Sequence, residues 1–469
     1  MREIPELFHP SFPLNDGGEV LVLNNGARIT SEDQAMLGAM DSRSVGGFRK
    51  HLLRVIKNGP GTFMSQFYVH YGHQSIGDMG SAFVSISGIS MLAAKAIQDF
   101  PLYNGQESST RYIDFATQRF VDPVGTETSR QILESYRAFY LEGLEVMQAV
   151  LKERYPFDVI GDGNDARYAK AIKARAFDTM RSFLPAGAST NLTWTGPLRQ
   201  FADRLPILRN HVLSEVRDVA LAAEKALLLQ FPNSFANRAA DPDWKDRHAE
   251  RERYAKMCQE LYGYFVVDSR EAYPEFALTH DAVRINRLKE YAHALSLRPR
   301  GIELPWNIRE CGTAEFSFLL DFGSFRDLQR HRSVVIPMPL LTDQFDFEPW
   351  YLNELPRELG ARAEELLKTQ QAAREGLQQE NFLEQYYVPM GYRVPIRLTG
   401  DLRGLVYLIE RRARNDVHPT LHRRANQMAE VLQKQYGSQG LVLHVEDTPH
   451  TFSLKRGEQD IVERMPATV

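Results

Sequence analysis

Residues 184–199 read LPAGASTNLTWTGPLR, and residues 388–403 read VPMGYRVPIRLTGDLR. The two stretches share a proline, a glycine, a Thr-Gly pair and a Leu-Arg pair, in the same order and at the same spacing. Chance readily matches one proline or one glycine, but it rarely matches a whole ordered set. Self-similarity at a fixed spacing is typical of repeated structural units. The pair of stretches therefore predicts a tandem duplication.

Short strands and long helices are expected around both stretches. Apolar residues dominate 19–23, 83–87 and 316–321, which predicts strands. Amphipathic or Ala-rich patterns predict helices over 48–56, 91–98, 128–154, 166–182, 211–231, from 323, and over 358–380, 402–414 and 420–437. The tail from residue 440 has the pattern of short strands. These elements together indicate an α+β protein.

The chain is long enough for two domains. A single compact core rarely extends over 469 residues. Residues 232–251 are polar and contain prolines, so they are the best candidate linker. We expect one repeat over residues 1–235 and a second over 236–469.

Composition excludes several classes of protein. The chain is 43% hydrophobic and 25% charged, with a net charge of −4, which gives no general attraction to nucleic acid. No apolar run is long enough to span a membrane, and the N-terminus lacks the pattern of a secretory signal. The two cysteines, Cys258 and Cys311, form neither a disulfide framework nor a zinc motif. We expect a cytoplasmic protein without a bound metal, acting on a small molecule.

A polar segment lies upstream of each matched stretch. In the first half, residues 99–112 read DFPLYNGQESSTRY, and in the second half residues 330–343 read RHRSVVIPMPLLTD. A Ser-x-Arg turn offers a hydroxyl group and a guanidinium fork, which suit a phosphate monoester, and Glu107 can accept a hydrogen bond from a sugar or base. Arg330-His331-Arg332 places two permanent cations around an imidazole, which suits a dinucleotide pyrophosphate.

Each segment by itself has a simpler interpretation. Residues 107–111 could be a solvated loop or a helix cap, and residues 330–332 could be a basic surface patch. Their equivalent places in two repeats favour a nucleotide and flavin site.

The segments resemble the motif R-H-R-x-x-S-x-N-E-x-S-x-R-Y of the flavin-dependent thymidylate synthases. The first half matches the right end of the motif and the second half matches the left end. The matching residues are Glu107, Ser109, Arg111 and Tyr112 in the first half, and Arg330, His331 and Arg332 in the second. Asp99, Phe100 and Pro101 replace R-H-R in the first half, and Met338, Leu340 and Thr342 replace E, S and R in the second.

The resemblance extends thinly over most of each half. Arg403 and Arg412 stand where the family has two arginines on a late helix, although they could also be ordinary charges on a helix surface. The Glu-His pair that the family has ahead of its core strand is replaced by Asp78-Met79 and by Arg309-Glu310.

The resemblance implies two thymidylate-synthase-complementing-like domains, each a small, mainly antiparallel sheet with long helices. It implies FAD as cofactor, and methylation of dUMP at C5 with methylenetetrahydrofolate and NADPH, without a cysteine nucleophile. The positions that match the family's motif imply that substrate is bound by Glu107, Ser109, Arg111, Tyr112 and Arg412. They also imply that Glu107 and Arg412 act in catalysis. Arg330, His331, Arg332 and Arg403 bind the cofactor.

The losses in the two halves are complementary, so we expect a composite site built from both repeats. The resemblance also implies a homodimer of the fused chain. Two alternatives stay open. The first is a related flavin enzyme that modifies another pyrimidine nucleotide or transfers a hydroxymethyl group. The second is a nucleotide-binding protein that has lost its chemistry.

Overall fold

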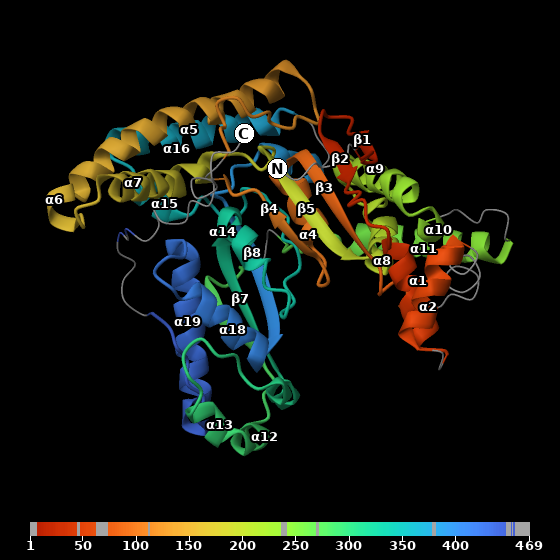
Figure 1. The fold of residues 1–469 in the computed structure, drawn as a ribbon. Helices are drawn as coiled ribbons and strands as arrows, with labels where there is room; N and C mark the ends of the chain where they lie inside the picture. The colour runs from red at the N-terminus through yellow and green to blue at the C-terminus, as the bar shows by residue number, and fades with distance from the viewer. Residues whose placement is uncertain are drawn as a thin grey trace. The chain divides into compact units, whose positions relative to one another are not determined.

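The computed structural model describes residues 7–44, 47–61, 74–110, 113–235, 242–268, 272–377 and 381–446, with residues 452 and 454. The chain forms two compact units (Figure 1). Unit 1 combines Met1–Ser109 with Ser189–Tyr264, and unit 2 combines Thr110–Ala188 with Phe265–Val469. Both units are discontinuous in sequence. The predicted boundary after residue 235 concerns the repeats rather than these units, and it stays a prediction.

Unit 1 contains an antiparallel sheet in the order β1-β2-β3-β5-β4. Its strands are β1 (Ser11–Pro13), β2 (Glu19–Val22), β3 (Ser81–Ser90), β4 (Asn104–Glu107) and β5 (Ser189–Pro197). The helices α4 (Met91–Gln98), α8 (Leu198–Leu208) and α9 (Ser214–Gln230) pack against the sheet. They cover alternate strand residues that are fully buried, including Val20, Val84 and Trp194.

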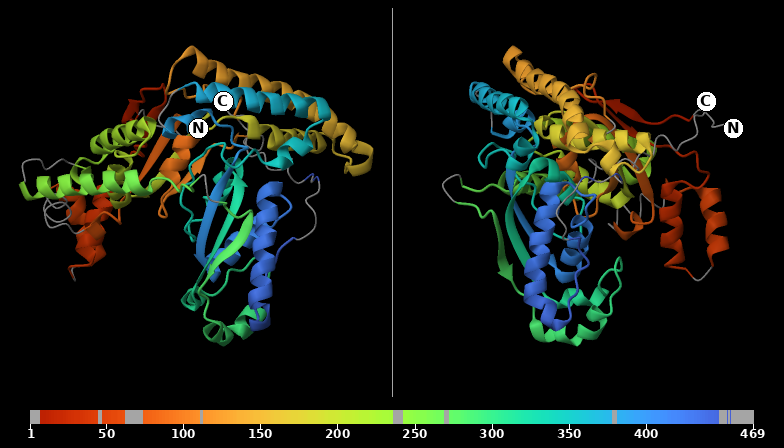
Figure 2. Two further views of the ribbon diagram at one scale, coloured as in Figure 1. Left: turned by 180° about the vertical axis from the view of Figure 1, so that it is seen from behind. Right: turned by 90° about the vertical axis from the view of Figure 1, so that its left-hand side faces the viewer.

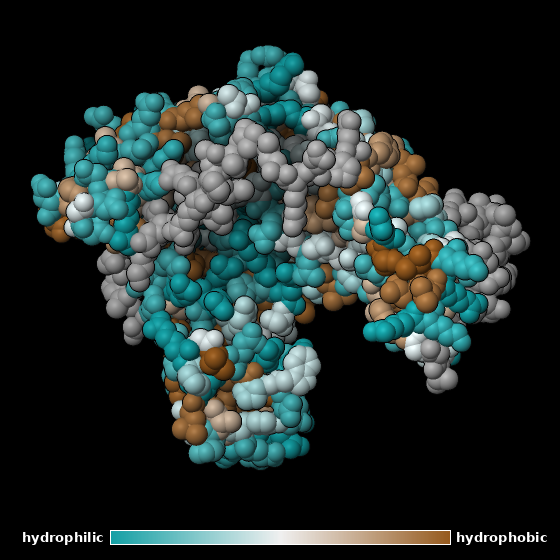
Figure 3. All heavy atoms as spheres, in the orientation of Figure 1, coloured by the Kyte–Doolittle hydropathy of each residue, from teal (hydrophilic) through white to brown (hydrophobic). Residues whose placement is uncertain are grey.

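Further helices complete unit 1. α1 (Ser31–Asp41) packs with α2 (Phe48–Asn58), while α10 (Pro232–Phe235) packs on α9 and α11 (Pro242–Tyr262) on α8. A short turn, η2 (Gln74–Ile76), precedes β3. Figure 3 shows hydrophobic side chains gathered over α1 and α2, where Phe48, Leu53 and Ile56 are exposed.

Unit 2 contains an antiparallel sheet in the order β6-β7-β8. The strands are β6 (Phe276–Asp281), β7 (Thr313–Asp321) and β8 (Arg393–Asp401). The helices α14 (Phe322–Leu328), α18 (Leu402–Arg412) and α19 (Pro419–Tyr436) pack against them, as the two views of Figure 2 show for α18 and α19.

A helical layer forms the rest of unit 2. Its long helices α5 (Glu127–Arg154), α7 (Asp165–Met180) and α16 (Arg357–Glu375) lie side by side (Figure 1). The shorter elements of unit 2 are α6 (Phe157–Ile160), α12 (Ile285–Glu290), α13 (Ala292–Ser296), α15 (Pro349–Glu354), α17 (Asn381–Glu384), η4 (Arg181–Phe183), η5 (Trp306–Cys311), η6 (Gln385–Tyr387) and η7 (Gly437–Gln439), of which η5 contacts α18 and η7 contacts α19. Because α5 and α7 come from the first half of the sequence, this unit contains residues of both predicted repeats.

The same order of elements occurs twice along the chain. A strand leads directly into a helix in β3–α4 and again in β7–α14, and a later strand leads into two helices in β5–α8–α9 and in β8–α18–α19. The strand registers also correspond, since Ser90 pairs with Ser189 where Asp321 pairs with Arg393. β3 is 10 residues long and β7 is 9, and the difference falls at a bulge between Ile86 and Ile89. Gly88 in that bulge adopts a φ of +68°, which glycine tolerates without steric cost.

Both first helices are capped by a hydroxyl and a carboxylate, with the two groups exchanged between the units. The Ser90 side chain caps α4, and its hydroxyl donates to Glu215 at 2.5 Å. The Asp321 carboxylate caps α14 by accepting from the Ser324 N–H at 2.8 Å, and it is also hydrogen-bonded by Thr420. Either arrangement satisfies backbone donors that a buried helix start would otherwise leave without partners.

Most predicted elements agree with the structure within a few residues, and 91–98 matches α4 at both ends. Two expectations are wrong. Residues 242–251 of the supposed linker lie within α11, because Pro242 stands at the helix start, where proline is well tolerated. Residues 441–446 form no strand. Among the described residues, no helix is long and apolar enough to cross a membrane.

Candidate functional site

The Arg-His-Arg sequence lies in the turn that follows α14 in unit 2. His331 is buried, and its Nε2 accepts a hydrogen bond from the Arg412 Nε at 2.7 Å. Burial and then the neighbouring Arg412 lower the pKa of His331 to about 3, so the imidazole is neutral near pH 7. The last turn of α18 therefore presents Arg412 to the motif, and the structure brings these two predicted site residues together.

Asp327, one turn before His331, is surrounded by arginines. Burial opposes its ionisation, but the charges of Arg330, Arg412, Arg181 and Arg326 outweigh burial and lower the pKa of Asp327. The Arg330 Nε lies 3.5 Å from the Asp327 carboxylate, and Arg412 donates to the Asp327 carbonyl oxygen at 2.6 Å. We call these five residues the Asp327 cluster. Four permanent cations around one carboxylate leave an excess of positive charge, which favours an anionic ligand.

Arg181 is a member of this cluster that the sequence did not reveal. It begins η4, in the first half of the sequence, whereas the other members belong to the second half. Burial disfavours its charge, but Asp178 and then Tyr351 and Asp327 outweigh burial and raise its pKa. Its Nε is buried and has no hydrogen-bond partner among the described residues. A buried donor without a partner is costly unless a ligand supplies the acceptor.

The two other predicted cofactor residues differ from each other. Arg332 is exposed beside the cluster. Arg403, in the first turn of α18, forms an ion pair with Glu303 and donates to the Leu304 carbonyl oxygen at 3.1 Å. Arg403 is therefore already neutralised by a carboxylate, which the sequence did not predict.

Glu107 and Ser109, from the right end of the motif, belong to unit 1. The Glu107 side chain is only 2% exposed and forms an ion pair with Lys95 of α4 at 2.7 Å. The Gln98 side chain donates to the same carboxylate at 3.0 Å. Ser109 is exposed, and the predicted substrate residues Arg111 and Tyr112 lie outside the described residues.

The turn after α4 in unit 1 lacks the cations of its counterpart in unit 2. Arg204 of α8 lies over the Phe100 ring, 5.3 Å from its centre, and donates to the Asp99 carbonyl oxygen at 2.7 Å. Leu208, which ends α8 as Arg412 ends α18, is fully buried. An apolar ring and an arginine bound to a backbone carbonyl oxygen therefore stand where unit 2 has an excess of positive charge, and the buried Arg204 Nε, like that of Arg181, has no hydrogen-bond partner among the described residues.

The positions of the missing Glu-His pair carry ion pairs in both units. Asp78 accepts from Arg199 at 3.1 Å in unit 1, and Arg309 donates to Asp401 at 2.8 Å in unit 2. No group of histidine, cysteine and carboxylate side chains suited to a metal ion occurs among the described residues.

Comparison with known proteins gives a family for the first half of the chain. Residues 30–233 match the sequence model of the Thy1 family, which is described as thymidylate synthase complementing protein. These residues form a domain of the flavin-dependent thymidylate synthase family. The match includes the Glu107 region and Arg181, and it ends before the Arg-His-Arg turn.

Relatives extend over both halves of the chain. A UPF0159 protein of Chlamydia muridarum is 27% identical, over 84% of this chain and 86% of its own length. A UPF0159 protein of Thermoplasma acidophilum is 25% identical, over 82% of this chain and 89% of its own. Another, from Chlamydia pneumoniae, is 24% identical over 76% and 75%. The similarity to these proteins therefore includes the Thy1 domain and much of the second half.

FAD is the cofactor that the family implies, and its anionic part fits the residues of unit 2. The exposed guanidinium groups of Arg330 and Arg332 suit a pyrophosphate, and the orphaned Nε of Arg181 is a further donor in the Asp327 cluster. Arg403 fits less well, since Glu303 already pairs with it.

Proposed function

We propose that this protein is a flavin-dependent enzyme that methylates C5 of a pyrimidine deoxynucleotide. It converts dUMP to dTMP with methylenetetrahydrofolate and NADPH. The observation that carries the proposal is the Asp327 cluster, which concentrates positive charge in a chain that contains a Thy1-family domain.

Tandem duplication is part of this proposal. The repeated order of elements, the corresponding strand registers and the matched sequence stretches all support it. After duplication, one copy is free to lose residues that the other supplies. A homodimer of the fused chain would then present the same number of repeats as a tetramer of single domains.

The arginines of unit 2 have two proposed tasks. Arg412 and Arg181 contact the pyrimidine ring of the nucleotide, and Arg412 stabilises the negative charge that develops on the ring during attack by C5. Arg330, His331 and Arg332 hold FAD, with Arg403 at the edge of the flavin site. The neutral His331 keeps Arg412 oriented through the 2.7 Å hydrogen bond.

The remaining substrate residues come from the first repeat. Glu107 is the proposed acceptor for a sugar or base donor, held in place by Lys95. Ser109, Arg111 and Tyr112 are proposed to bind the phosphate and the base. Mutation of each repeat in turn tests whether one composite site needs both.

Bound FAD, once reduced by NADPH, supplies the hydride that turns the transferred methylene group into a methyl group. No cysteine nucleophile is required. Burial raises the pKa of Cys311, so this thiol stays protonated and is a poor nucleophile.

Release of the C5 proton from dUMP tests the activity. Tritium at C5 should appear in water when wild-type protein, NADPH and methylenetetrahydrofolate are present, and Arg412→Ala should stop the release. Release without folate would favour the related flavin enzyme instead. No release under either condition would contradict both.

One observation favours a second candidate, a nucleotide-binding protein without flavin chemistry. Glu303 forms an ion pair with Arg403, and Asp401 forms one with Arg309. Carboxylates of the protein therefore already neutralise two arginines near the expected flavin site. Purified protein that binds dUMP but never acquires the yellow colour of FAD would support this alternative.

A further inference from the structure

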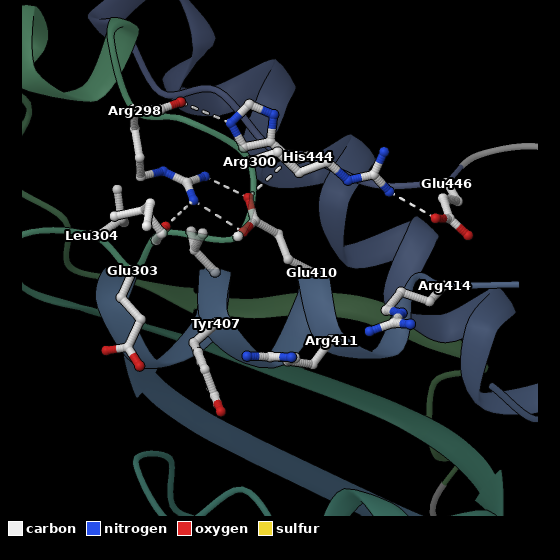
Figure 4. A pocket seen from close by; sticks show the side chains of 13 residues that line it. Arg298, Arg300, Glu303, Leu304, Tyr407, Glu410, Arg411, Arg414, His444 and Glu446 are labelled. Carbon is white, nitrogen blue, oxygen red and sulfur yellow. Dashed lines mark hydrogen bonds and ion pairs between the residues drawn. The ribbon is translucent and has the colours of Figure 1, made fainter. Parts of the chain in front are cut away.

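A cavity of about 250 Å³ lies in unit 2 between residues 298–304 and α18 (Figure 4). Arg298 forms its inner wall with a side chain that is only 3% exposed. This guanidinium pairs with Glu410 and donates to the Ile302 carbonyl oxygen at 2.6 Å. The His444 N–H donates to Glu410 at 2.9 Å. The inner wall is thus a paired and hydrogen-bonded framework, which gives the cavity a defined shape.

The open side of the cavity is cationic. Arg411 lies over the Tyr407 ring at 5.3 Å from its centre, and Figure 4 shows the two side chains next to each other. Within the described part of the chain, Arg411 forms no ion pair. Arg300 and Arg414 add two further exposed guanidinium groups, each paired with a carboxylate that is itself partly exposed. Arg411 is therefore the cation best placed to receive an anion.

An exposed aromatic platform adjoins this cavity. Trp306 is 65% exposed and lines an open hollow of about 630 Å³ with Arg309 and Asp401. Arg403 links the two places, since it lies 5.7 Å from the Trp306 ring centre and donates to Leu304, which lines the cavity. A flat exposed indole flanked by cations suits a planar heteroaromatic ring.

The cavity also lies beside the proposed active site. The Tyr407 ring meets the His331 ring edge-on, with centres 5.9 Å apart. Arg411 is near enough to His331 to contribute to the lowering of its pKa. A ligand in the cavity would therefore lie next to the Arg-His-Arg turn.

We propose that residues 298–310 and α18 form a binding groove for a co-substrate that joins a planar heteroaromatic ring to an anionic tail. The ring stacks on Trp306 and the tail reaches Arg411. The proposal rests on the proposed function, because it assigns the groove to a second substrate of that reaction. A reduced nicotinamide dinucleotide and a folate with several glutamates share this chemistry.

Calorimetric titration of the purified protein distinguishes the two sources. The ligands are NADPH, a pteroyl-triglutamate, and inorganic pyrophosphate as a tail without a ring. We expect one of the two organic ligands to bind, and Arg411→Gln and Trp306→Leu each to weaken that binding about tenfold, a change of about 1.4 kcal/mol. Arg411→Lys should retain more of the affinity than Arg411→Gln. Pyrophosphate should bind weakly and respond to Arg411→Gln alone.

Arg362→Gln is the matched control, since Arg362 is an exposed, ion-paired arginine on α16. It should leave the affinity unchanged. The groove proposal is overturned if neither organic ligand binds, if the Arg411 and Trp306 variants bind as wild type does, or if added FAD displaces the ligand from the groove. Failure of the proposed function gives a different result. The protein would then bind no FAD and release no C5 proton, but its binding of the organic ligand would still depend on Arg411 and Trp306.

Discussion

The turn after α4 in unit 1 and the turn after α14 in unit 2 have the same place in the order of elements but opposite chemistry. Unit 1 has Phe100 packed under Arg204, whose Nη2 donates to backbone carbonyl oxygens while its buried Nε has no partner among the described residues. Unit 2 has His331 beside an excess of arginines, one of which has a buried donor without a described partner. The comparison shows that the same place in the order of elements carries an aromatic ring under one arginine in unit 1 and a buried histidine among several arginines in unit 2.

The largest expected effect is on turnover. Arg330→Ala and Arg412→Ala should each reduce C5 proton release by at least about a thousandfold, since each removes a charged donor from the site. Arg111→Ala should do the same if the site is composite. The control Arg204→Lys changes the corresponding turn of unit 1 and should leave the rate within about threefold of wild type. Normal turnover of Arg330→Ala would contradict the proposal that the turn after α14, unlike the turn after α4, belongs to the active site.

The ion pair between Lys95 and Glu107 should matter next. Lys95→Met leaves a buried carboxylate without its cation and should lower the free energy of unfolding by about 3–5 kcal/mol. The double variant Lys95→Met, Glu107→Leu should recover most of that loss, because it buries no lone charge. Urea unfolding measures both. An unchanged single variant would mean that Glu107 is not buried as an ion pair.

Acid should destabilise the protein partly through His331. Its folded-state pKa of about 3 lies below the ordinary value of 6.5, so the unfolded chain binds the proton first. The stabilising contribution is present in full above pH 6.5 and is lost as the pH falls from 6.5 toward 3, by about 1–3 kcal/mol at pH 4.

His331→Phe, which copies the residue at position 100, should remove this part of the pH dependence. Unfolding curves at pH 7 and pH 4.5 for wild type and variant give the difference. The same pH dependence in both proteins would contradict a buried neutral imidazole.

The smallest effect concerns the ion pairs that replace the family's Glu-His. Arg199→Gln breaks an exposed pair with Asp78 and should leave the midpoint of urea unfolding close to that of wild type. Arg309→Gln should have a similarly small effect on the midpoint, although it also removes the cation near Trp306. A much larger shift of the midpoint in either unit would show that these pairs support the adjoining strand.

The helices and strands could be predicted well because the residue patterns that specify them lie within short stretches of sequence. The run from Met91 to Gln98 has small, apolar residues after a capping serine, and it forms α4 as expected. The linker predicted over residues 242–251 is wrong because a helix with charged residues on most of its faces has the same polar composition as a linker. Pro242, at the start of α11, was the sequence feature that indicated a helix.

The site could be predicted only in part because its decisive contacts join distant residues. Arg330, His331 and Arg412 could be selected from the motif, and the structure brings them together. Arg181 and Glu303 could not, since nothing in their local sequence indicates that one lies near Asp327 or that the other neutralises Arg403.

The most direct test of the central claim is the flavin content of the purified chain, measured by its absorption spectrum after reconstitution with FAD. We predict one FAD per chain, a spectrum that dUMP perturbs, and loss of the flavin in Arg330→Ala. A chain that binds no FAD, or that binds two with equal affinity, would contradict the assignment of the site to the Arg-His-Arg turn of unit 2.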